Sequence, residues 1–269
     1  MEKPNSARYL YHANAVALGG QITSPFNEVI EAQASSVLPI TGGYASARVE
    51  MFRYRELVSF GAAYSTVIGS ETKQDDHSII HTLSTVTVER LNVAGVVTAD
   101  AVVARLVSRV DLATNARTVT AVGSHFVNLR IAGFRFELQP SPILIEDASL
   151  PQLRNACAAD RSLQSLGHAL DYIQAFVDGT LKQPVDREPK AVASLFALPR
   201  DRAGNSIGPA GCGARDNCGI RVPGFGTAFI GEFYISPFAR QLTMLRIEMG
   251  CPVGGGAVVC ILGGNGSPQ

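Results

Sequence analysis

The chain has 269 residues, which is long enough to bury a sizeable hydrophobic core as one β-rich domain or as two smaller domains. Its 23 basic and 23 acidic residues give a formal net charge of zero, so no overall field attracts nucleic acid or anionic lipid. We therefore expect no nucleic-acid partner. No apolar run approaches the roughly 18 residues of a membrane helix, and the first residues contain no continuous apolar signal segment, so we also expect no transmembrane segment and no signal peptide.

A short apolar phrase occurs in four copies along the first half of the chain, the first and fourth weaker than the others. The copies begin near residues 16, 52, 91 and 129, and read VALGGQIT, FRYRELVS, LNVAGVVT and LRIAGFRF. Apolar and polar residues alternate around the phrase, which is typical of strands. Each copy therefore predicts two strands joined by a bend at or near Gly20, Glu56, Gly95 or Gly133.

Equivalent copies would place equivalent side chains on the same face of a sheet. We expect two rows of inward-facing residues, formed by Phe52, Leu91 and Leu129 and by Tyr54, Val93 and Ile131. The intervening Asn92 and Arg130 are expected to face outward and to contribute little to stability.

The periodicity changes after residue 148. Steps of three and four separate a set of apolar residues that form one stripe of an amphipathic helix: Leu163, Leu166, Leu170, Ile173 and Val177. We therefore divide the chain into a β-repeat region (1–148), a helical insertion (149–181), a linker and Gly-rich loop (182–225) and a C-terminal β segment (226–269). All four are expected to form one globular domain.

The predicted fold is mainly β, with repeated hairpin-like units that form a sandwich or a barrel and with one amphipathic helical insertion. A solenoid is the third arrangement, because alternation with a period of two is common to all three. The long alternating strands favour the first two.

The run LNVAGVVTADAVVARL, followed one unit later by GSHFVNLRIAG, resembles the repeat region of the bacterial exported proteins grouped as the choice-of-anchor P family. The resemblance covers about residues 80–135. It implies a β-rich bacterial module of secreted or cell-surface type, without an established chemistry. The chain departs from that pattern in lacking an evident signal or anchor and in carrying a helix and cysteines.

Two polar clusters are candidates for catalysis or metal binding. Asp75, Asp76, His77 and His81 carry the carboxylate and imidazole donors that bind zinc, although a solvated loop between two strands also accounts for them. Glu50 and Glu89 occupy equivalent places in two units. If the two lie on neighbouring strands, they could act as the pair of catalytic carboxylates that a glycoside hydrolase uses. Nearby arginines favour the other interpretation, an exposed ladder of ion pairs.

Four of the five cysteines stand in two local pairs, Cys212 with Cys218 and Cys251 with Cys260. Each pair straddles a turn-rich segment and is predicted to form a local disulfide in an oxidising compartment. The spacing within each pair is wider than that of a four-cysteine zinc site.

The sequence contains no nucleophile elbow, Walker loop or dinucleotide-binding fingerprint. We therefore expect a non-enzymatic structural or binding module without a cofactor, whose partner is a protein, a glycan or a second copy of the chain. One alternative is a hydrolase or metal-dependent enzyme that uses either polar cluster. Another is a membrane-active β protein, indicated by the apolar stretch 224–264.

Overall fold

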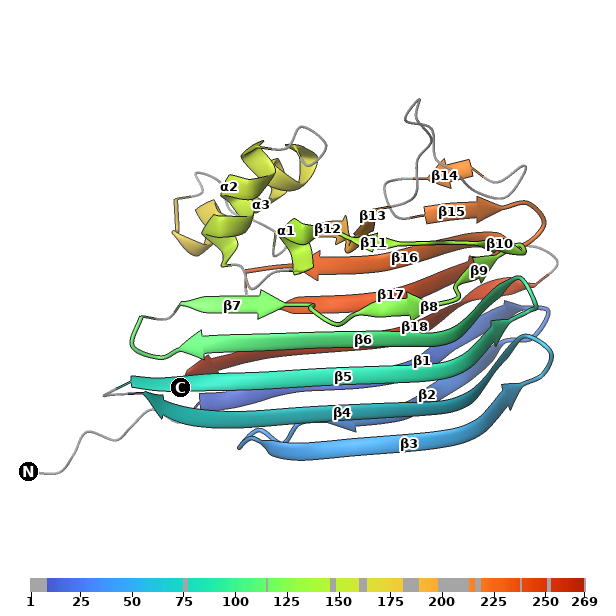
Figure 1. Ribbon diagram of the computed structural model, residues 1–269, viewed down its shortest axis with the longest axis horizontal. Helices are drawn as coiled ribbons and strands as arrows, with labels where there is room; N and C mark the ends of the chain where they lie inside the picture. Colours follow the sequence, from blue (N-terminus) through green and yellow to red (C-terminus); the bar gives the residue numbers. More distant parts are fainter. Residues whose placement is uncertain are drawn as a thin grey trace, which may run out of the picture.

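The computed structural model describes residues 9–74, 77–114, 116–145, 149–159, 164–180, 189–197, 213–215, 219–237, 239–250 and 253–268. Two antiparallel sheets dominate this part of the chain and lie face to face (Figure 1). The fold is therefore mainly β, as predicted, and of the arrangements considered it is the sandwich.

Sheet A contains both ends of the described chain. Its strand order is β14 (Gly213–Arg215), β15 (Gly219–Val222), β16 (Gly226–Ile235), β17 (Arg240–Met249), β18 (Gly254–Pro268), β1 (Tyr9–Ser24) and β2 (Glu28–Val37), with β12 (Ala191–Ser194) also paired to β16. The first and last of the described strands, β1 and β18, are neighbours along almost their whole length. Residues nearly the whole chain apart are therefore neighbours in the interior of this sheet.

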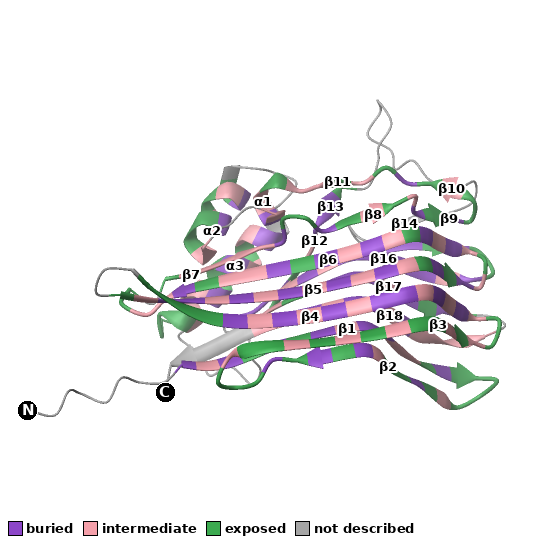
Figure 2. Ribbon diagram, turned by 60° about the horizontal axis from the view of Figure 1, so that its bottom comes forward, coloured by how far each residue is buried: buried purple, intermediate pink, exposed green. Residues whose placement is uncertain are grey.

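The chain enters sheet B by a short connection from β2, which belongs to sheet A, to β3. Its order is β10 (Phe134–Arg135), β9 (Arg130–Ile131), β6 (Val97–Asp111), β5 (His77–Val93), β4 (Val58–Gln74) and β3 (Gly43–Tyr54), with β7 (Arg117–Thr120) and β8 (His125–Val127) paired to β6. Buried and exposed residues alternate along its long strands (Figure 2). One face of each strand therefore packs into the sandwich.

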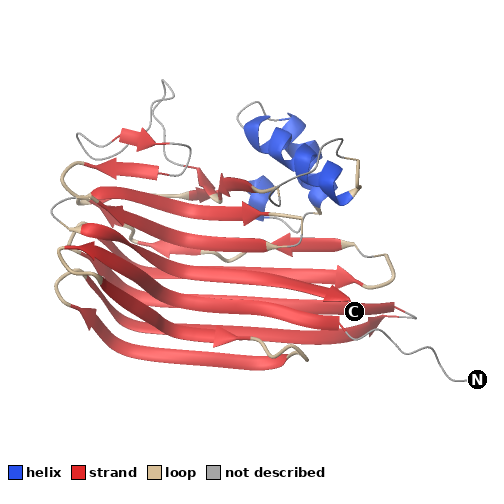
Figure 3. Ribbon diagram, turned by 180° about the vertical axis from the view of Figure 1, so that it is seen from behind, coloured by secondary structure: helices blue, strands red, loops and turns tan. Residues whose placement is uncertain are grey.

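The helical insertion lies beside the edge of the sandwich, where the chain passes from sheet B back to sheet A (Figure 3). It contains α2 (Leu150–Ala159) and α3 (Gln164–Val177), preceded by the short α1 (Pro142–Ile145). Leu166, Leu170 and Ile173 of the predicted stripe are buried, whereas Val177 is exposed and Leu163 lies outside the described residues. The insertion thus contains more than the single helix that the stripe predicted.

The segment expected to be a linker and loop contributes to the sheets. It contains β12, β14 and β15 of sheet A, and β13 (Phe196–Ala197), which pairs with β11 (Gln139–Pro140). The described parts of this segment form strands because they gain backbone hydrogen bonds from neighbours such as β16, whereas residues 182–188, 198–212 and 216–218 lie outside the described residues.

The hairpin turns of sheet B explain the Ala-Gly phrase. Their first residues, Arg55, Ala94 and Ala132, all have φ between 49° and 52°. The amide of Ala94 donates to the carbonyl of Leu57 in the preceding turn (2.7 Å), and the amide of Ala132 donates to the carbonyl of Val96 (2.8 Å). The three turns therefore stack at one end of the sheet, and the glycines after the two alanines take the positive φ that a tight hairpin requires.

A second set of residues in the left-handed region lies four positions before each turn. Met51, Arg90 and Asn128 have φ between 51° and 53°, while strand pairing continues in the same register on both sides of Arg90. Such a residue interrupts the alternation of faces, so that β5 buries Val86 and Val88 before it and Leu91 and Val93 after it. The long strands bend near the end of the sandwich where these turns lie (Figure 1).

The predicted core rows face inward. The aliphatic members of both rows are all buried: Leu91, Val93, Leu129 and Ile131. The aromatic members, Phe52 and Tyr54, are half-buried against the core. Asn92 and Arg130 are exposed, as expected.

The first predicted bend does not divide β1 into two strands, although the register between β1 and β2 shifts between Leu18 and Gly20. Gly20 lies inside β1, which continues for four more residues, and pairs with Ala257 of β18. A Cβ at this position would lie 2.4 Å from the carbonyl oxygen of Gly256. Gly20 therefore allows the backbones of β1 and β18 to approach closely, which is another reason for a glycine inside a strand.

Candidate binding site

The histidines of the predicted metal cluster lie apart along one strand. His77 is exposed at the start of β5, and His81 is half-buried four residues further on. Four residues of extended chain separate their backbones by about 13 Å. Asp75 and Asp76 lie outside the described residues. Within the residues that the structure describes, no group of three His, Cys, Asp or Glu side chains is arranged to hold a metal ion.

Glu50 and Glu89 are not on neighbouring strands, so that expectation was wrong. Glu50 lies on β3 and Glu89 on β5, and both pair with Ala62 of the intervening β4. Two strand spacings separate their backbones by about 9.5 Å. Glu50 forms an exposed ion pair with Arg48, which agrees with the ladder interpretation.

Cys260 is a buried free thiol. It has a φ of 54°, and its Sγ donates to the carbonyl oxygen of Val102 at 3.7 Å, which ties β18 of sheet A to β6 of sheet B. Burial raises the pKa of the Cys260 thiol well above its usual value. Its predicted partner Cys251 lies outside the described residues, as do Cys212 and Cys218.

Cys260 is therefore expected to resist alkylation in the folded protein, because the thiolate is the reactive species and burial disfavours it. Peptide mapping by mass spectrometry after brief treatment with N-ethylmaleimide at pH 7.5 should find Cys260 unmodified, and should find it labelled when denaturant is added first. Rapid labelling without denaturant would contradict the buried position.

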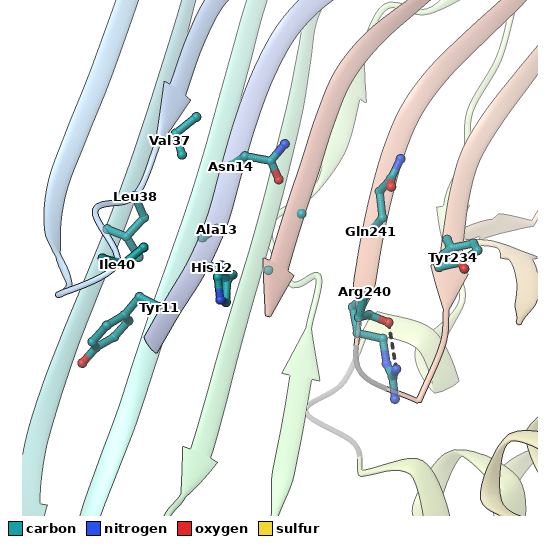
Figure 4. Close-up of a pocket in the computed structure, with 13 residues that line it drawn as sticks. Tyr11, His12, Ala13, Asn14, Val37, Leu38, Ile40, Tyr234, Arg240 and Gln241 are labelled. Carbon is teal, nitrogen blue, oxygen red and sulfur yellow. Dashed lines mark hydrogen bonds between the residues drawn. The ribbon is translucent and has the colours of Figure 1, made fainter. Parts of the chain in front are cut away.

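A cavity of about 400 Å³ lies at the end of sheet A where β1 begins and β17 begins (Figure 4). Its lining comes from five strands or their flanking segments: Tyr11, His12, Ala13, Asn14, Val37, Leu38, Ile40, Tyr234, Ala239, Arg240, Gln241, Gly263 and Gly264. We call it the sheet A cavity. Its volume falls within the range of about 300–1,000 Å³ that small-molecule sites occupy.

A single cross-strand row forms the centre of the sheet A cavity. Strand pairing places Tyr234 opposite Gln241, Gln241 opposite Gly263, Gly263 opposite Asn14, and Asn14 opposite Val37. Gly263 provides a floor between the two amide side chains, because a Cβ there would lie 2.3 Å from Oδ1 of Asn14. The amides of Asn14 and Gln241 thus flank a shallow trough.

The two walls of the cavity differ in chemistry. On the side of β2, the aliphatic side chains of Val37 and Ile40 are 66% and 58% exposed. On the side of β16 and β17 stand the phenol of Tyr234 and the amide of Gln241. A ligand in this cavity would meet an apolar wall on one side and a polar wall on the other.

Arg240, which precedes Gln241 at the start of β17, directs its side chain to the inner face of the sheet, because successive residues of a strand point to opposite faces. Its Nη1 donates to the carbonyl oxygens of Ser236 and Ala239, the latter at 3.0 Å. Burial, followed by repulsion from Arg117, lowers the pKa of Arg240 from its usual value to about 10. The guanidinium therefore remains charged at neutral pH.

None of these lining residues was singled out from the sequence. The cavity is assembled from segments as distant as Asn14 and Gly263, which only the pairing of β1 with β18 brings together. One signal was available: the pair Gly263–Gly264 stands inside an apolar alternating segment, and glycine in a strand indicates a close approach or missing side-chain volume.

The fold and this cavity define a β-sandwich protein with a trough across the end of one sheet. Residues 9–172 match the family described as domain of unknown function DUF8256, and the chain belongs to that family. No curated protein and no solved structure matches the chain. The resemblance to the choice-of-anchor P family stays a prediction. No helix in the described part of the chain is long and apolar enough to cross a membrane.

Proposed function

We propose that the protein is a non-enzymatic binding module and that its ligand lies in the sheet A cavity. The observation that carries this proposal is the pair of amides, Asn14 and Gln241, on either side of the glycine floor. An amide both donates and accepts hydrogen bonds, as a sugar hydroxyl does. The exposed Val37 and Ile40 supply an apolar wall for the C–H face of a pyranose ring. A short oligosaccharide fits both requirements.

Rigid positioning supports the same proposal. Asn14, Gln241 and Gly263 all lie within paired strands, so the distances between their backbones are set before any ligand arrives. A preformed site loses little conformational entropy on binding. A module of secreted or cell-surface type in a bacterium, as the sequence resemblance implies, would meet glycans in its surroundings.

Screening the fluorescently labelled full chain against an array of plant, fungal and bacterial oligosaccharides tests this function. We expect binding to at least one class of glycan. Gly263→Val should weaken it at least tenfold, because the new side chain displaces the Asn14 amide and fills the floor. The clash is with a flexible side-chain end, so the variant is expected to fold.

Gly19→Val is the matched control. Gly19 also lies in sheet A, but a Cβ there would meet no atom closer than 3.8 Å, and the residue does not line the cavity. Its binding should equal that of the unmodified protein. Either a complete lack of glycan binding by the unmodified chain or unchanged binding by Gly263→Val would refute the proposed function.

A further inference from the structure

The row of residues at the centre of the sheet A cavity continues beyond the cavity onto β12. Val192 of β12 pairs with Tyr234 of β16, which in turn pairs with Gln241 of β17. Residues directly opposite each other on neighbouring strands share a face of the sheet, so Val192 lies on the face that carries the amides of Asn14 and Gln241. The complete row crosses six strands, and we call it the trough row: Val192, Tyr234, Gln241, Gly263, Asn14 and Val37.

Both ends of the trough row are exposed apolar side chains. Val192 is 54% exposed and Val37 is 66% exposed. The phenol ring and the two amides stand between them, and Figure 4 shows the labelled side chains of Val37, Asn14, Gln241 and Tyr234 following one another across the strands. A ligand long enough to reach from one valine to the other would contact both, whereas a short ligand held between the amides would reach at most one of them.

The length of the trough row sets the length of such a ligand. Neighbouring strands lie about 4.8 Å apart, so a row across six strands spans about 24 Å. One pyranose unit of an extended chain advances by nearly the same distance as one strand spacing, so successive sugars would lie over successive strands. About five units would therefore cover the trough row, at ~4.8 Å for each strand step.

The neighbouring side chains favour a ligand that crosses the strands over one that follows them. Ile261 lies two residues from Gly263 on β18 and therefore on the same face, with Val16 and Thr243 paired on either side of it. A chain that ran from Gly263 along β18 would meet these three side chains directly. A chain that lay across the strands would instead meet the amides beside Gly263, which can donate and accept hydrogen bonds.

Charge favours a neutral ligand. The six residues of the trough row are all of uncharged types. Glu232 lies two residues before Tyr234 on β16 and shares its face, but both of its carboxylate oxygens accept hydrogen bonds from Arg246 at 2.7 Å. That carboxylate is therefore neutralised by an ion pair, and a ligand over the trough row needs no charge to match it.

We propose that the trough row binds one extended, neutral polysaccharide chain that lies across the strands, with about five sugar units between Val192 and Val37. The inference rests on the proposed function in taking the same cavity as the ligand site. It deepens that function by assigning the direction, length and charge of the glycan and by adding Val192 to the site. The amides of Asn14 and Gln241 hydrogen-bond hydroxyls in the middle of the chain, and the two valines and the Tyr234 ring contact the C–H faces of sugars toward its ends.

Isothermal titration of the full chain with β-1,4-linked oligomers of glucose, xylose and N-acetylglucosamine, each from two to six units long, tests the inference. We expect at least one series to bind, with affinity that rises at least tenfold from the dimer to the pentamer and then levels off. Val192→Asp should weaken binding of the pentamer at least tenfold, because a charge replaces an apolar contact. The same variant should leave binding of the dimer unchanged, because a dimer between the amides does not reach β12.

Val122→Asp is the matched control. Val122 is 52% exposed and lies between β7 and β8, which belong to sheet B, so the substitution makes the same chemical change outside the trough row. Its binding of every oligomer should equal that of the unmodified chain. A thermal melt of each variant checks folding. If Val192→Asp is unstable, Val37→Asp at the other end of the row makes the comparison, and the length dependence of the unmodified chain needs no variant.

The outcomes separate this inference from the proposed function. Equal affinity for dimer and pentamer, or equal binding of the pentamer by Val192→Asp and the unmodified chain, would overturn the extended chain. Glycan binding confined to acidic or branched members of the array would also overturn it. In each of these cases, binding that Gly263→Val weakens would leave the proposed function standing, whereas a lack of binding to any glycan would refute both.

Discussion

Replacing Leu91 or Leu129 by alanine is expected to lower the free energy of unfolding by about 2–5 kcal/mol. Leu91 is 1% exposed on β5 and Leu129 is 0% exposed just before β9, so each truncation removes buried apolar area and leaves a cavity. The loss is large because neighbouring strands hold the surrounding side chains and limit their collapse. Urea denaturation followed by circular dichroism measures it.

Arg130→Ala is the matched control for this series. Arg130 follows Leu129 directly but is exposed, so its truncation should change stability by about 0.5 kcal/mol or less. Equal losses at Leu129 and Arg130 would contradict the inward and outward assignment.

Asn92 is exposed, but its side chain makes a hydrogen bond that the sequence did not predict. Its Oδ1 accepts a hydrogen bond from the amide of Gly95 at 2.8 Å, so it holds the turn between β5 and β6. Asn92→Ala should therefore cost about 0.5–1.5 kcal/mol, between the two leucines and Arg130.

Gly20→Ala is expected to destabilise the protein by about 1–3 kcal/mol, although it adds one methyl group. That Cβ would lie 2.4 Å from the carbonyl oxygen of Gly256 and 2.9 Å from the Cα of Ala257. Both atoms belong to the backbone of β18, so neither can move without disturbing the strand pairing. The same denaturation experiment measures the loss.

Gly19→Ala provides an unusually close comparison, because the two glycines are adjacent in β1. At Gly19 the nearest atom to a new Cβ would be 3.8 Å away, which is an ordinary contact. Its effect should stay within about 0.5 kcal/mol. Similar values for the two variants would show that β1 and β18 do not approach as closely as described.

Local sequence predicted much of sheet B and the nature of the insertion. The alternation around Leu91 and Val93 indicated strands, and Gly95 and Gly133 indicated the turns, because hairpin turns need positive φ and glycine adopts it without strain. The apolar stripe through Leu170 indicated a helix with one face toward the core. These features depend on interactions between residues close in sequence.

Alternation alone did not reveal the bends within strands. Arg90 takes a left-handed conformation inside β5, where nothing in its own chemistry favours it, because a non-glycine residue is strained there. The surrounding sheet imposes that conformation. Gly20 is the converse case, in which a residue typical of bends lies in a continuous strand because β18 passes close to it.

The sequence by itself determined that this chain is mainly β, where most of the hairpins of sheet B turn and which residues around Leu91 and Leu129 enter the core. These properties follow from side-chain periodicity and from backbone preferences, which act over a few residues. Only the tertiary structure decided that β1 pairs with β18, and hence that Asn14, Arg240 and Gly263 line one cavity. Strand pairing depends on contacts between residues far apart in the chain, and no local pattern specifies which strands become neighbours.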